Sequence, residues 1–100
     1  MDREELAQEQ GTLTWPELER HFARGVVVVV DLSLDLLTVA EAMARDDRTL
    51  FTEWMTSGLV MRAEDEHAKY WETSGCVLHA IVVAPWVLVS PLGDSIERVH

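Results

Sequence analysis

Two pairs of glutamate and histidine residues have the spacing of metal ligands on a helix. Glu64 and His67 form a Glu-x-x-His motif, and Glu17 and His21 lie four positions apart. Residues three or four positions apart share one face of a helix, so each pair could bind a metal through a carboxylate and an imidazole. Di-iron bundles use two such motifs and two further carboxylates, a larger set than these residues supply. The sequence therefore favours solvated acidic helix faces and no metal cofactor, and these four residues are the metal candidates if their helices meet.

The nucleophilic side chains do not form a recognisable catalytic arrangement. Cys76 begins an apolar segment and His79 lies three residues later, on the opposite face if that segment is a strand. A Cys–His pair needs both side chains within hydrogen-bonding reach of each other. No serine stands in a Gly-x-Ser-x-Gly motif, and the five glycines are too isolated to form a phosphate-binding loop. We therefore predict no catalytic residue and no cofactor, and favour a protein that is not an enzyme.

Residues 36–58 have the pattern of a helix-turn-helix. Within this segment four acidic residues outnumber two arginines, and Asp46 and Asp47 stand where a DNA-reading helix would contact bases and phosphates. The whole chain has a formal charge of −10. DNA-binding proteins take much of their affinity from Lys and Arg at phosphates, so this charge makes nucleic acid an unfavourable partner. The sequence favours a packed helical hairpin, and a winged-helix-like nucleic-acid-binding regulator is the alternative.

Hydrophobic periodicity and capping signals predict five short helices. Thr14 and Glu17 match the Thr-x-x-Glu capping box, which marks a helix start. From Leu36, apolar residues recur at i, i+3, i+4 and i+7, as on one face of a helix. The predicted helices cover residues 2–10, 15–24, 36–45, 47–57 and 64–72, and the stripe expected to be buried in the fourth helix is Leu50, Phe51, Trp54 and Met55.

Two apolar segments predict the main strands. Residues 26–30 are five consecutive valines, and the lack of polar alternation indicates a strand that is buried on both faces. Residues 76–89 form the second segment. Pro85 cannot donate a ladder hydrogen bond, so it divides this segment into strands at 76–83 and 86–89. A short strand at 59–62 follows Gly58, which we predict to be a left-handed helix cap.

These elements predict a small α+β fold in a single domain of residues 1–100. About five short helices pack on a sheet built from residues 26–30 and 76–89, with the helical hairpin at 36–58. Residues 1–12 and 93–100 are expected to be loosely held. Five modest helices are few to cover two strands that are apolar on both faces. We therefore expect a homodimer in which a second copy covers exposed apolar surface, with Trp86 at the contact.

Several features favour a cytoplasmic protein. Cys76 is the sole cysteine and cannot form a disulfide within the chain, which suits a reducing compartment. The first ten residues are charged and contain no apolar stretch of the kind that signal peptides have. Neither apolar segment reaches the roughly 20 residues that a membrane helix needs. The negative charge also disfavours binding to anionic membrane surfaces, so we expect no membrane partner.

The order and spacing of short motifs along the chain indicate a family. They are Trp15-Pro16-Glu17-Leu18, the valine run with Asp31, Leu34-Asp35-Leu36 before Val39-Ala40, Asp46-Asp47, Trp54 with Gly58-Leu59, and Ile81 to Leu88. In these motifs, over roughly residues 6–92, the chain resembles a family of small bacterial proteins catalogued only as a domain of unknown function. The resemblance implies a bacterial cytosolic origin and supplies no activity, cofactor or catalytic residue.

The function that the sequence favours is protein interaction. We expect an uncharacterised bacterial cytosolic protein that acts as a homodimeric protein-interaction module and that could also bind another protein. One alternative is the winged-helix-like regulator described above. The other is a small metal-binding protein or enzyme that uses carboxylates and histidines.

Overall fold

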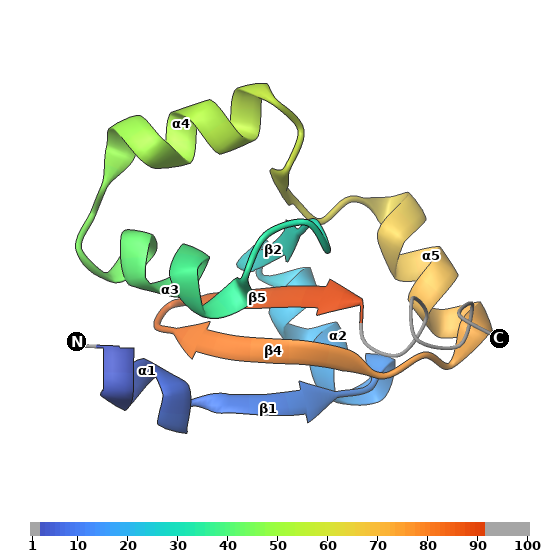
Figure 1. Ribbon diagram of the computed structural model, residues 1–100. Coiled ribbons are helices and arrows are strands. Elements are labelled where there is room, and N and C mark those ends of the chain that lie inside the picture. The colour runs from blue at the N-terminus through green and yellow to red at the C-terminus, as the bar shows by residue number, and fades with distance from the viewer. Residues whose placement is uncertain (1–2, 92–100) are drawn as a thin grey trace, which may run out of the picture.

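The computed structural model describes residues 3–91, which form one five-stranded sheet and five helices (Figure 1). The helices are α1 (Arg3–Gln8), α2 (Trp15–Ala23), α3 (Leu36–Ala44), α4 (Arg48–Thr56) and α5 (Asp65–Ser74). The strands are β1 (Gln10–Leu13), β2 (Val27–Val30), β3 (Val60–Arg62), β4 (Leu78–Val83) and β5 (Trp86–Pro91). Their order is β1-β4-β5-β2-β3, with β2 parallel to β5 and all other neighbours antiparallel. The predicted α+β fold is confirmed.

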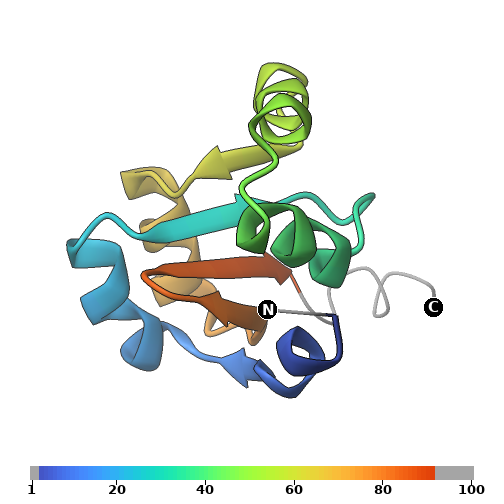
Figure 2. The same cartoon turned by 90° about the vertical axis from the view of Figure 1, so that its left-hand side faces the viewer.

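The sheet is the middle layer of three. In Figure 2, α1 and α3 lie on one side of the strands and α2 and α5 lie on the other. The first side encloses the α1/α3 core, which consists of Leu6, Val28, Val30, Leu36, Val39, Ala40, Val60, Ile81, Val83 and Leu88. The second side encloses the α2/α5 core, which consists of Leu18, Val27, Trp71, Leu78, Ala80, Val87 and Val89.

The valine run supplies both cores, as its composition predicted. Val27 belongs to the α2/α5 core, whereas Val28 and Val30 belong to the α1/α3 core. Successive side chains of a strand point to opposite faces, so a strand between two helical layers must be apolar at every position. Both faces of β2 are thus covered by helices of the same chain. This strand therefore needs no second copy to cover it, and its burial does not favour a dimer.

The second apolar segment forms a hairpin. Strands β4 and β5 pair antiparallel and are joined at Ala84 and Pro85, so the predicted division at the proline is confirmed. Strand β4 begins at Leu78, later than predicted, which leaves Cys76 in the connection before it. Through β5, the hairpin pairs with the valine strand, with Leu88 opposite Val28. The two apolar segments therefore lie in one sheet.

The N-terminal segment has defined secondary structure within the described residues, and its predicted looseness over residues 1–12 stays a prediction. Helix α1 ends at Gln8, short of residue 10, and Leu6 is fully buried against the sheet. Residues Gln10–Leu13 form the edge strand β1, with Gln10 opposite Ile81 of β4. This strand is mostly exposed and lacks an alternating apolar pattern, so its conformation comes from pairing with β4 and not from its own sequence. The expectation for residues 93–100 lies outside the described residues.

The helical hairpin packs on the face of the sheet through α3, and α4 adds only a partial contact of Phe51 and Trp54 with the edge of the α1/α3 core. Figure 1 shows α4 above α3 and away from the sheet. None of the side chains of α4 is buried; Met55 is 55% exposed, and the rest of the predicted apolar stripe is only half-buried. The prediction of a buried stripe is therefore wrong for α4, because α3 occupies the sheet face that α4 would need. Within residues 3–91, no helix has the length and apolar character required to cross a membrane.

Candidate functional site

A groove lies between α4 and the body of the domain, and we call it the α4 groove. Its volume is about 800 Å³, and its walls come from α3, α4, β2, β3 and the β4–β5 hairpin. The apolar lining consists of Val28, Ala42, Met43, Ala44, Phe51, Met55, Val60, Met61, Val83, Ala84, Pro85 and Trp86. The polar lining consists of Asp46, Asp47, Arg48, Thr52 and Arg62. Concave, mainly apolar sites with a few polar groups are typical of binding sites.

The connections at both ends of α4 create this groove. At the N-terminal end, three residues join α3 to α4, and Asp46 adopts a left-handed conformation with φ 58°. At the C-terminal end, Gly58 has φ 78° and leads within two residues into the edge strand β3, as the predicted left-handed cap requires. These short connections hold α4 beside the edge of the sheet, where it cannot pack on a face.

The carboxylate of Asp47 supports the start of α4. Its Oδ1 atom accepts a hydrogen bond of 3.1 Å from the backbone N–H of Leu50, a typical N-cap interaction. We expect Asp47→Ala to lower the opening free energy of α4 by about 1 kcal/mol, because the helix loses its cap. Amide hydrogen exchange of α4 measures this effect. Asp47→Asn is the matched control, since asparagine caps equally well; equal exchange in both variants would contradict the prediction.

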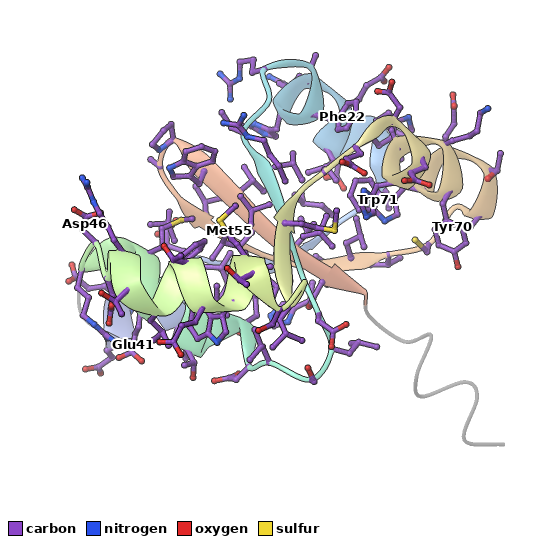
Figure 3. All side chains as sticks on the ribbon, turned by 90° about the horizontal axis from the view of Figure 1, so that it is seen from above. Phe22, Glu41, Asp46, Met55, Tyr70 and Trp71 are labelled. Atoms are coloured by element: carbon purple, nitrogen blue, oxygen red, sulfur yellow. The ribbon has the colours of Figure 1, made fainter. Side chains whose placement is uncertain are left out.

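Three methionines and two aromatic side chains form the apolar walls. Met43 comes from α3, Phe51 and Met55 from α4, Met61 from β3 and Trp86 from β5. Figure 3 shows Met55 on the side of α4 that faces the β4–β5 hairpin, with Asp46 at the N-terminal end of the helix. Methionine is flexible and polarizable, so walls of this composition adapt to differently shaped apolar partners.

The charges in the groove balance, unlike those of the whole chain. Its lining has two aspartates and two arginines, whereas the chain carries −10. The Asp46 carboxylate lies 3.4 Å from Arg48 Nε, and the Asp47 carboxylate lies 3.3 Å from a terminal guanidinium nitrogen of Arg45. Arg62 is different, because its guanidinium carbon lies 5.5 Å from the ring centroid of Trp86, in a cation–π contact. Among residues 3–91, no carboxylate lies within ion-pairing distance of Arg62.

Trp86, the predicted contact residue, is half-buried and lines the α4 groove. Its role in an interface stays a prediction. Sequence reasoning did not find Met61 and Arg62, the neighbours that complete this part of the groove. Both lie in β3, and no short motif marks them, because their importance comes from the pairing of β3 with β2.

The first pair of metal candidates is engaged in local interactions of α2. Glu17 Oε1 accepts hydrogen bonds from the backbone N–H of Thr14, at 3.0 Å, and from its hydroxyl, at 3.2 Å, which confirms the predicted capping box. His21 Nδ1 lies 2.9 Å from a terminal nitrogen of Arg24, which can only donate. Burial lowers the pKa of His21, and the positive charges of Arg24 and Arg20 lower it further. The lowered pKa favours the neutral ring, which can accept this hydrogen bond.

The second pair stands at the start of α5. The backbone N–H of Glu64 donates a hydrogen bond of 2.9 Å to His67 Nδ1, so one ring nitrogen of His67 serves the helix terminus. The ring also lies against Trp71, with centroids 5.7 Å apart. In the part of the chain that the structure describes, no three His, Cys, Asp or Glu side chains are grouped so that they could hold a metal ion.

Cys76 and His79 have separate hydrogen-bonding partners. The backbone N–H of Cys76 donates to Ser74 Oγ at 3.3 Å, and the residue packs against the α2/α5 core. His79 Nε2 lies 2.9 Å from Gln10 Oε1 on the neighbouring strand β1. The histidine therefore helps to hold the edge strand.

Comparisons with known proteins place this architecture among related chains. A family model described as "Protein of unknown function (DUF2288)" matches residues 2–91. The NMR solution structure of PA1075 from Pseudomonas aeruginosa is similar, with 38% sequence identity and a TM-score of 0.82 over 90% of this chain and 83% of that chain. No curated protein matches the chain.

Proposed function

This chain belongs to the family described as proteins of unknown function (DUF2288), and from that premise we propose that it acts as a homodimeric protein-interaction module. The proposed contact surface is the α4 groove, and its occupant is a second copy of the chain. In this arrangement each α4 packs against the groove of the other copy around a twofold axis, so that both copies use the same surface.

The observation that carries the proposal is the exposure of α4. A nine-residue helix is marginally stable by itself and depends on tertiary packing. Here it has no buried side chain, while Phe51 and Met55 line an open apolar groove. Phe51 and Trp54 pack only partly against the α1/α3 core. A second copy that packs on this surface would bury Phe51 and Met55 further and would add support to the helix.

Charge favours a second copy as the occupant. Two chains that each carry a net charge of −10 repel each other over most of their surfaces. The charges that line the α4 groove sum to zero, so two copies can approach there with the least repulsion. Trp, Met and Arg are also the residue types enriched in interfaces, and Trp86, Met55 and Arg62 all line this groove.

Charge weighs against the nucleic-acid alternative. Asp46 and Asp47 stand at the N-terminal end of α4, where a recognition helix would meet phosphates. Both carboxylates pair with arginines of the same turn. The positive charges of those arginines are therefore partly neutralised and attract phosphates less. A salt-sensitive shift of random duplex DNA at low ionic strength would favour the alternative.

The test is the effect of a buried charge on assembly. We expect Met55→Glu to weaken self-association at least about tenfold, because a symmetric contact would enclose the new carboxylate twice. Trp86→Glu is expected to act in the same direction. Sedimentation equilibrium over a wide concentration range measures the mass.

The matched control is Tyr70→Glu. Tyr70 is as exposed as Met55, at 55%, but lies on α5, on the other side of the sheet. It should leave the dimer unchanged. A wild-type chain that stays monomeric at all concentrations would contradict the proposal, as would a Tyr70→Glu variant that dissociates as strongly as Met55→Glu.

A further inference from the structure

Within the α4 groove, we infer that Arg62 and Trp86 form a binding site for a small apolar carboxylic acid. The acid's carboxylate binds the Arg62 guanidinium, and its hydrocarbon part lies along the methionine-lined walls. Because the ligand and a second copy need the same space, ligand binding dissociates the dimer. The binding site stands on the groove's own chemistry, whereas the competition rests on the proposed function.

Arg62 lies at the groove beside Trp86. Its guanidinium lies over the indole of Trp86, and no other described side chain forms an ion pair with it. A guanidinium carries its five N–H donors in its own plane, in a fork that matches both oxygens of a carboxylate. Contact through the ring face leaves those donors available at the edges. Arg62 is thus an exposed side chain at the groove whose donors have no hydrogen-bond acceptor within residues 3–91.

The distribution of charge favours a singly charged anion. Asp46 and Asp47 have arginine partners, Arg48 and Arg45, so their charges are already compensated. Arg62 is then the arginine of the groove lining that has no carboxylate partner among residues 3–91. One unpaired cation fits a singly charged anion. A phosphate group would bring a second negative charge to a single unpaired cation, on a chain with a net charge of −10.

The size and composition of the groove suit a small ligand. Its volume of about 800 Å³ lies within the range of about 300–1,000 Å³ typical of small-ligand sites. Such sites combine apolar and aromatic walls with a few polar groups that fix orientation. Met43, Phe51 and Met61 supply those walls here, and Arg62 supplies the orienting group. An unbranched aliphatic chain suits methionine side chains, which adapt their shape to it.

The effect on assembly follows from mass action. A ligand that binds only the open groove favours the monomer, because the groove of the dimer is filled by the second copy. Each bound carboxylate also makes the contact surface more negative. The site would therefore couple the amount of an apolar acid to the assembly state.

The test is calorimetric titration of the full chain with decanoate below its micelle concentration. Decanol and decylamine serve as neutral and cationic probes of equal chain length. We expect decanoate to bind at least about tenfold more tightly than decanol, because a charge-assisted bidentate pair is lost with the alcohol. Decylamine should bind more weakly still. The Trp86 indole N–H resonance should move on binding.

Two variants assign the site. Arg62→Gln keeps a long polar side chain but removes the charge. It should weaken the binding of decanoate at least about tenfold and leave the binding of decanol unchanged. Arg20→Gln, on α2, also removes one positive charge, but on the other side of the sheet. It should leave the binding of both decanoate and decanol unchanged. Equal binding of decanoate and decanol, or no effect of Arg62→Gln on decanoate, overturns the inferred site.

Sedimentation at saturating decanoate separates this inference from the proposed function. A dimer that persists with decanoate bound overturns the competition and leaves the dimer intact. Arg62-dependent binding by a chain that is monomeric without ligand supports the site and overturns the proposed dimer. A shift from dimer to monomer supports both.

Discussion

Replacing Leu88 with alanine is expected to lower the free energy of unfolding by about 2–5 kcal/mol. Leu88 is fully buried in the α1/α3 core. It lies in β5, opposite Ile81 of β4 on one side and Val28 of β2 on the other. Loss of its side chain removes apolar contacts and leaves a cavity where the surrounding strands cannot close in.

Urea denaturation measures this change. The Met55→Glu background is the suitable one, because there the apparent stability should contain little contribution from assembly. Val82→Ala is the control: it removes a similar side chain from the paired strand β4 at a position that is 41% exposed. Surface substitutions change stability by about 0.5 kcal/mol or less. Similar losses at the two positions would show that the assigned core is wrong.

Trp71→Ala is expected to lower the free energy of unfolding by about 3–5 kcal/mol. Trp71 is 4% exposed and contributes to the contact between α5 and the neighbouring helix α2 on the same side of the sheet. Its ring lies 6.3 Å from that of Trp15, and His67 packs on it as well. An alanine would leave the α2/α5 core without its largest side chain, and denaturation with near-ultraviolet circular dichroism would report the loss.

Tyr70→Ala is the neighbouring control on the same helix. Tyr70 is mostly exposed, so its truncation should change the free energy of unfolding by about 1 kcal/mol or less. If Tyr70→Ala destabilised the chain as much as Trp71→Ala, the assignment of the inward face of α5 would be refuted.

The two stability variants lie outside the proposed contact surface, although Leu88 pairs with Val28, which lines it. Neither Leu88 nor Trp71 lines the α4 groove, and none of the side chains of α4 is buried in either core. Effects at well-separated sites generally add, so the effect of Trp71→Ala on folding can be measured independently of assembly. For Leu88→Ala, whose strand partner Val28 lines the groove, the Met55→Glu background is needed to separate the two. The two cores stabilise the sheet, whereas α4 forms one wall of the groove at the edge of the sheet.

The features that the sequence determined are those that depend on local patterns. Thr14 and Glu17 cap α2, as their spacing requires, and Gly58 takes the left-handed conformation that ends α4. Pro85 divides the second apolar segment because it lacks a backbone donor. The valine run is buried on both faces because every position is apolar. In each case the residue type itself restricts the backbone or the burial.

Tertiary structure alone decided the strand order, the edge strand β1 and the position of α4. Residues Gln10–Leu13 become a strand through pairing with β4, and their polar composition carries no strand signal. The apolar stripe of α4 predicted a buried face, yet short connections at both of its ends hold the helix beside the sheet. Arg62 and Trp86 meet although 23 residues separate them, because their strands lie in one sheet. Such contacts join residues distant in the chain, and a local pattern contains no information about which distant partner a segment finds.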